Sequence, residues 1–240
     1  MEDKLAEFVR RLKQALGDDL KAVVLYGSAL TGEFLSKHSD LNTLCIVEHS
    51  SYSQLARMYD AVRWWTRQSH GHPAPLVFTF EELQRSADVF AIELVDIKLH
   101  HRMLLGADFF EQFEVPLRLH ALQLEREFRV NWIRLREAIL AAPPRKSTRL
   151  AIMNSSVSSF CTLFRHALWA LSGQMPGRKR EAVDGIAALT GGNPTGFRTI
   201  LDLREGKIKP RSIDIEETLR SYLELVEIAT NEVDRRLESQ

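Results

Sequence analysis

Two short stretches carry the residue types that could do chemistry. Gly27-Ser28 follows the apolar run 23–26, and Ser39-Asp40 precedes a second apolar run that continues to Val47. A glycine at a turn lets backbone N–H groups come close to a phosphate, and a carboxylate is an oxygen ligand that magnesium favours. Neither stretch alone specifies a site, because Gly-Ser turns are common after strands and Ser39-Asp40 would also suit the start of a turn.

Taken together, the strand, the Gly-Ser turn and a second strand opening on an acid resemble the signature of the nucleotidyltransferase superfamily. This polymerase-beta-like group includes aminoglycoside nucleotidyltransferases and the minimal bacterial nucleotidyltransferases. The resemblance implies a bacterial protein that moves a nucleotidyl group from a nucleoside triphosphate, with ATP as the expected donor, to a hydroxyl of a small molecule or protein. It implies cofactor-binding roles for Gly27, Ser28 and Ser39, catalytic roles for Asp40 and Asn42, and Mg²⁺ binding by Asp40.

The sequence departs from the family pattern at Asn42, which stands where a second aspartate is usual. Residues i and i+2 of a strand project to the same face, so Asn42 would still face the metal beside Asp40, but without a negative charge. The strand expected at 75–80 also lacks the acid that the family carries there. Glu93 and Asp96 are the next acids in an apolar setting, and either could supply the missing charge.

These departures leave more than one function open. The first is nucleotidyl transfer, and the second is a catalytically degenerate protein that binds a nucleotide or a partner without turnover. A third is an interaction scaffold that forms a homodimer through exposed faces of the last helix, with Tyr222, Leu225 and Ile228 as candidates. In a purely structural role, Asn42 would hold the Gly27 turn by hydrogen bonds.

The strands and helices that we expect around these residues indicate an α/β fold in the first half of the chain. Apolar runs that alternate little are typical of strands buried on both faces, and helical spacing of apolar residues marks the helices between them. We expect strands at 22–26, 41–47 and 76–80, an edge strand at 102–105, helices at 5–16, 52–68 and 88–99, and a helical turn that starts at 81–83.

The pattern changes near Val115-Pro116, after which helical spacing continues to the end. Pro and Gly breaks divide this half into helices at about 117–140, 147–171, 178–189, 195–203 and 213–237. We therefore expect a nucleotidyltransferase-like α/β domain over residues 1–115, with a mixed sheet and flanking helices, followed by an all-α helical bundle over 116–240.

The amino-acid composition limits the kinds of partner molecule that we expect. Lys plus Arg and Asp plus Glu both number 32, so the formal net charge is zero and neither nucleic acid nor a membrane is an expected partner. Cys45 and Cys161 each lie within an apolar run, as small core residues of a protein from a reducing compartment do. The acidic start Met1–Lys4 does not resemble a targeting segment, and a cytoplasmic location is expected.

Histidines and basic clusters offer further candidate sites. The pairs His70/His72 and His100/His101 lack the arrangement of a metal site, because the first pair falls in a polar loop and the second is expected on a helix, where the rings point apart. We expect capping or surface roles for them. The basic clusters 145–149 and 178–180 lie at expected helix starts, where solvated ends are the simplest interpretation.

Overall fold

A computed structural model of the chain describes residues 1–27, 29–30, 41–68 and 72–237. The chain divides into two compact units, Met1–Arg118 and Leu119–Gln240. Three of the expected site residues, Ser28, Ser39 and Asp40, lie outside the described residues. Within the described part of the chain, none of the helices combines the length and apolar character needed to span a membrane.

The first unit is built on a four-stranded mixed sheet with the order β3-β2-β1-β4. Its strands are β1 (Leu20–Tyr26), β2 (Asn42–Val47), β3 (Leu76–Phe78) and β4 (His101–Leu105). Strand β1 runs antiparallel to both β2 and β4, whereas β2 and β3 are parallel. The expected edge position of the fourth strand is confirmed, since β4 ends the sheet.

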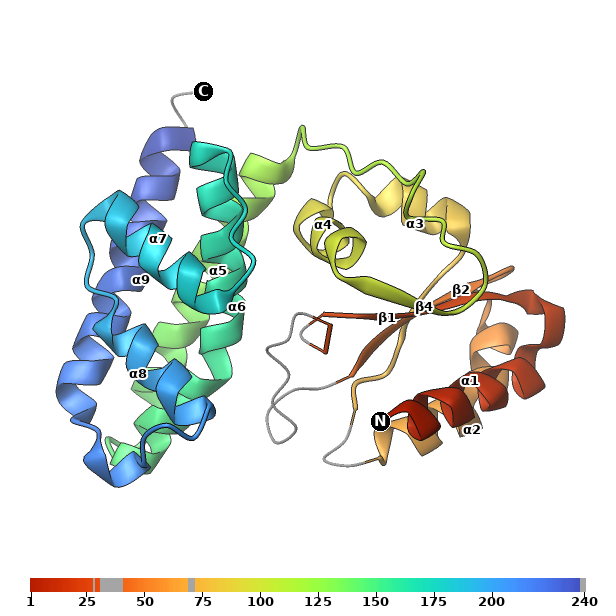
Figure 1. Ribbon diagram of the computed structural model, residues 1–240, viewed down its shortest axis with the longest axis horizontal. Helices are drawn as coiled ribbons and strands as arrows, with labels where there is room; N and C mark the ends of the chain where they lie inside the picture. Colours follow the sequence, from red (N-terminus) through yellow and green to blue (C-terminus); the bar gives the residue numbers. More distant parts are fainter. Residues whose placement is uncertain (28, 31–40, 69–71, 238–240) are drawn as a thin grey trace. The chain divides into compact units, whose positions relative to one another are not determined.

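Both faces of this sheet are covered by helices (Figure 1). Val23 and Leu25 of β1 pack on one side with α1 (Glu2–Leu16) and α2 (Tyr52–Thr66). Their neighbours along the strand pack on the other side, with α3 (Phe80–Ser86) and α4 (Ala91–Leu99). This alternation explains why β1 and β2 read as continuous apolar runs, and it confirms the prediction of strands buried on both faces.

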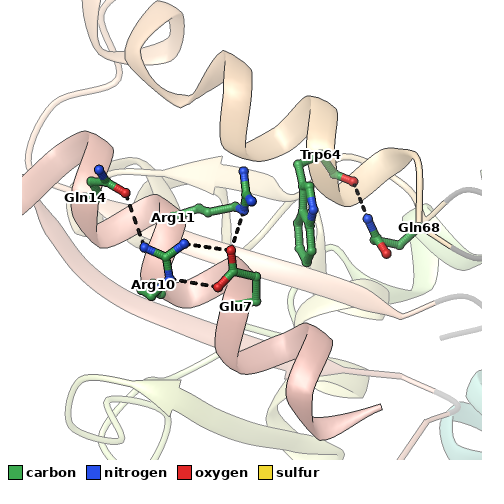
Figure 2. Close-up of polar contacts among 6 residues, drawn as sticks. All are labelled: Glu7, Arg10, Arg11, Gln14, Trp64 and Gln68. Carbon is green, nitrogen blue, oxygen red and sulfur yellow. Dashed lines mark hydrogen bonds and ion pairs between the residues drawn. The ribbon is translucent and has the colours of Figure 1, made fainter.

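The solvent-facing seam between α1 and α2 is polar, as Figure 2 shows. Glu7 accepts hydrogen bonds from Arg10 at 2.7 Å and from Arg11 at 2.7 Å. The hydrogen bond from Arg10, and to a lesser extent that from Arg11, lowers the pKa of Glu7 to about 2. The carboxylate therefore stays charged. The Arg11 guanidinium also lies 4.7 Å from the ring centre of Trp64, which joins the two helices by a cation–π contact.

Strand β3 is shorter than expected, because the helix that follows begins earlier. Thr79 and Glu82 form a capping box: the Thr79 hydroxyl accepts the Glu82 N–H, and the Glu82 carboxylate accepts the Thr79 N–H. This reciprocal pair makes Phe80 the first residue of α3. The sequence-based assignment of residues 79 and 80 to the strand was therefore wrong.

In the second unit, the described residues form helices and no strand. The helices are α5 (His120–Ala141), α6 (Lys146–Ser172), α7 (Lys179–Thr190), α8 (Thr195–Arg204) and α9 (Ile215–Leu237). Aromatic side chains fill their core, and the rings of Phe197 and Tyr222 stack at 3.9 Å. Helices α8 and α9 meet closely at Gly196, where a Cβ would lie 2.5 Å from the backbone nitrogen of Tyr222.

The expected all-helical second half is thus confirmed, but the surface assigned to its last helix is not. Tyr222 and Leu225 are fully buried, although the sequence analysis placed them on an exposed dimerisation face. Both belong to the inner apolar stripe of α9, which continues through Val226, Ala229 and Val233. A dimer interface on α9 would need other residues.

Candidate active site

The turn that follows β1 begins at Gly27, whose backbone has φ 86°. Its N–H donates to the carbonyl of His100 at 3.3 Å, and its own carbonyl accepts the N–H of Leu30 at 3.0 Å. Glycine is the residue that adopts this positive φ without steric cost. The turn is therefore held to the neighbouring strand by backbone bonds that any sequence could make, in a conformation that favours glycine.

Asn42 lies beside this turn as the first residue of β2, directly opposite Tyr26. A Cβ at position 27 would lie 3.2 Å from Nδ2 of Asn42, so the amide rests against the open face of the glycine. In the described part of the chain, no hydrogen bond joins the Asn42 side chain to the turn, which was its expected structural role. The contact between the two residues is one of packing.

Of the five residues predicted for the site, the structure thus brings together Gly27 and Asn42. The remaining three, Ser28, Ser39 and Asp40, are outside the described residues, and their roles stay predictions. In the sequence, Asp40 stands two residues before Asn42, the first residue of β2. The Gly27 turn and the start of β2 therefore mark one candidate site at this end.

A row of three polar side chains crosses the sheet at this end. Tyr26 pairs with Asn42 on one side and with His101 of β4 on the other, and directly paired residues project to the same face. That face is the one covered by α3 and α4, against which Tyr26 packs. The row presents an amide, a phenol and an imidazole to one side of the candidate site.

One of the two acids that the sequence left as alternatives, Glu93, acts electrostatically on the row. Burial raises the pKa of Tyr26, and the negative charge of Glu93 on α4 raises it further. Glu93 is exposed in the first turn of that helix. The charge of Glu93 thus acts on Tyr26, in the row beside Asn42.

Strand β3 contributes no acid, as expected. Its three residues, Leu76 to Phe78, are apolar and run parallel to Leu44–Ile46 of β2. Among the described residues, no group of three His, Cys, Asp or Glu side chains gathers where it could hold a metal ion.

Two histidines are placed differently from the sequence-based expectation. His101 lies in β4, not on a helix, because α4 ends at Leu99. Its Nε2 is 2.9 Å from a carboxylate oxygen of Asp108. His72, expected at the surface, is buried and stacks on Trp65 with ring centres 4.4 Å apart, and its Nδ1 is 3.5 Å from the N–H of Leu41.

The basic clusters of the second unit are occupied by intramolecular pairs. Arg149 bonds to Glu216, and Arg180 bonds to Asp202 at 2.6 Å and to Glu205 at 2.9 Å. These contacts agree with structural roles at helix ends. The charges of these two arginines are thus already balanced within their own unit.

Comparisons with known proteins were made for the whole chain. No family model matches it, and no curated protein matches it in sequence. Among solved structures, the crystal structure of spectinomycin adenyltransferase AAD(9) from Enterococcus faecialis with ATP and spectinomycin matches with a TM-score of 0.60. The match covers 95% of this chain and 99% of that chain at 13% identity. The chain therefore shares its fold with that adenyltransferase, which agrees with the fold expected from the residues around Gly27.

Proposed function

We propose that this protein transfers a nucleotidyl group from a nucleoside triphosphate, with ATP as the expected donor, to a hydroxyl of a small molecule or protein. One observation carries the proposal: in a fold shared with an adenyltransferase along 95% of the chain, Gly27 and Asn42 meet at one end of the sheet. The sequence puts a serine directly after that glycine and an aspartate two residues before that asparagine.

In this reaction the acceptor oxygen attacks the α-phosphorus and forms a new P–O bond. The bond between the α-phosphorus and the oxygen that bridges to the β-phosphorus breaks, pyrophosphate leaves with that oxygen, and the proton of the acceptor hydroxyl passes to solvent. The protein's part is to position the reactants and to balance charge. The glycine turn suits this work, because no side chain at position 27 keeps a phosphate away from the backbone.

Magnesium fits this site only in part. Mg²⁺ is often bound by one or two carboxylates together with phosphate and water oxygens, and Asp40 with the amide oxygen of Asn42 would provide the protein's share. When bound, the ion would neutralise charge on the triphosphate. The acid-free strand β3 and the neutral Asn42 argue for a weaker metal site than three carboxylates would make.

A second function is favoured by those same two features. Two unit charges 4 Å apart interact by about 4 kcal/mol at an effective dielectric constant near 20. Losing a carboxylate beside a divalent ion therefore weakens the site strongly, even after solvent compensation. A protein that binds the nucleotide, or a partner, without turnover is the alternative that this loss of charge supports.

One experiment separates the two functions. Release of pyrophosphate is measured with each nucleoside triphosphate, with and without Mg²⁺, over a panel of hydroxyl acceptors, and compared for the wild type, Asp40→Asn and Asp60→Asn. Asp60 is an exposed acid on α2 and serves as the matched control. Mg²⁺-dependent release that is lost only in Asp40→Asn supports transfer.

Binding is followed in parallel by thermal shift with the same triphosphates. A shift without pyrophosphate release, lost in Gly27→Val, supports binding without turnover, because a valine at φ 86° would be strained and would press on Asn42. If no triphosphate causes either pyrophosphate release or a thermal shift, both nucleotidyl transfer and nucleotide binding are refuted. The interaction scaffold would then be the remaining interpretation.

A further inference from the structure

His101 occupies a defined place next to the candidate site. It is the first residue of β4, directly opposite Tyr26, and its side chain is 14% exposed. Nδ1 lies 2.9 Å from the carbonyl oxygen of Lys98, and Nε2 lies 2.9 Å from Oδ2 of Asp108. The ring also packs on Phe110 at 4.6 Å between ring centres. The imidazole is thus fixed on both nitrogens and on one face.

Both partners of the ring are hydrogen-bond acceptors. The carbonyl of Lys98 can only accept a hydrogen bond, so Nδ1 donates to it. The ionised carboxylate of Asp108 accepts as well, and a hydrogen bond to a charged group of this kind is stronger than one between neutral groups. The hydrogen bond from His101 is the main cause that lowers the pKa of Asp108, which keeps this carboxylate ionised.

Asp108 extends the pair to the segment after β4. Its second oxygen, Oδ1, accepts the N–H of Phe110 at 2.9 Å. Phe110 is buried in the core between the sheet and α4. The His101–Asp108 pair therefore ties the start of β4 to a residue that cannot move without disturbing that core.

The His101–Asp108 pair is connected to the Gly27 turn through one peptide bond. The carbonyl that accepts the Gly27 N–H belongs to His100, in the peptide bond that joins His100 to His101. Fixing the His101 ring therefore limits how this peptide can rotate. Together with the Gly27–Leu30 hydrogen bond and the contact with Asn42, this accepting carbonyl sets the orientation of the turn.

We infer that His101 and Asp108 are positioning residues that hold the Gly27 turn in the conformation that accepts the triphosphate. The inference rests on the proposed function for the identity of the ligand. It assigns the pair no contact with the nucleotide. Loss of the pair should weaken nucleotide binding while the chemical step, where there is one, keeps its rate.

The test compares Asp108→Asn with Lys98→Met. Asparagine keeps an oxygen for the Phe110 N–H but removes the charge that pairs with His101. Lys98→Met removes a different tether of the same segment, the bond from Nζ to the carbonyl of Phe113 at 2.6 Å. Affinity for a non-hydrolysable ATP analogue is measured by calorimetry, and exchange of the Gly27 amide hydrogen by NMR.

We expect Asp108→Asn to bind the analogue about three- to tenfold more weakly, as suits a partly exposed charge-assisted bond. Its Gly27 amide should exchange faster, whereas Lys98→Met should match the wild type in both readouts. If turnover is observed, KM for the triphosphate should rise in Asp108→Asn with kcat unchanged.

Equal affinity and equal Gly27 exchange in wild type and Asp108→Asn would overturn the positioning role and leave the proposed function standing. A wild type that binds no triphosphate would overturn both. Equal losses in Asp108→Asn and Lys98→Met would also overturn the positioning role, since they would show a general loosening of the segment.

Discussion

Replacing Gly27 by alanine should destabilise the α/β unit through two separable effects. The first is the backbone conformation, because φ 86° costs an L-residue about 1–2 kcal/mol. The second is the contact with Asn42: a Cβ 3.2 Å from Nδ2 forces the amide to shift by a few tenths of an ångström. Crowding of this kind adds about 1 kcal/mol in a well-packed site. We expect a total loss of about 2–3 kcal/mol.

A double-mutant cycle separates the two effects. In an Asn42→Ala background the crowding disappears, so Gly27→Ala should cost about 1 kcal/mol less than in the wild type. Gly191→Ala provides the backbone control, since Gly191 has φ 72° and no atom within 4 Å of its Cβ position. The free energy of unfolding is read from native-state hydrogen exchange at buried amides of the unit that carries the change: that of Val24 in β1 for Gly27→Ala, and that of Phe164 in α6 for the Gly191→Ala control.

The reasoning fails if Gly27→Ala costs no more than Gly191→Ala and is insensitive to the residue at position 42. That result would mean that the amide of Asn42 rotates away at no cost. It would remove the packing link between the turn and β2, on which the description of one joint site depends.

Three further predictions follow from the structure. Asn42→Asp should tighten Mn²⁺ binding in the presence of a triphosphate by at least about tenfold, because it restores a carboxylate; unchanged binding in a titration followed by electron paramagnetic resonance would contradict this. Gly196→Ala should cost about 3 kcal/mol or more in urea unfolding, because its Cβ would meet the backbone of α9 at Tyr222. Burial, and to a lesser extent His166, lowers the pKa of His120 to about 4 from 6.5, so the neutral ring is the form that folding favours. The contribution of the neutral His120 to the free energy of unfolding should therefore be fully present above pH 6.5 and be lost, by at most about 3 kcal/mol, as the pH drops towards 4. His120→Gln should flatten this part of the pH profile of unfolding.

Much of the fold could be predicted, because its elements follow from local patterns. The apolar runs of β1 and β2 reflect burial on both sides, and the helices of the second half follow from spacing and Gly or Pro breaks. The start of α3 was expected at Glu81, one residue too late, although its signal, Thr79 followed by Glu82 three residues later, is present in the sequence. Propensity favoured a longer strand there, whereas the capping bonds favour the helix.

The site was less predictable, because its parts meet only in the folded sheet. The nearness of Gly27 and Asn42 followed from the order of strand, turn and strand. The row through Tyr26 and His101 depends on the pairing of β1 with β4, and the charge of Glu93 reaches Tyr26 from a helix packed on the sheet. A periodic pattern along the sequence cannot predict these contacts, because they join residues of different secondary-structure elements. For the same reason the sequence analysis expected His101 on a helix and did not predict its hydrogen bond to Asp108.

The central place of β1 has a consequence for synthesis of the chain. Its first neighbour, β2, leaves the ribosome soon after it, but its second neighbour, β4, begins only at His101. Until then one edge of β1 has no partner, and pairing across so long a stretch is slow because of its loop-closure cost. A nascent chain that stops before β4 keeps an apolar strand with an open edge, which is a template for aggregation. Codon changes that delay translation between residues 48 and 100 should therefore lower the yield of folded protein more than the same changes after residue 118.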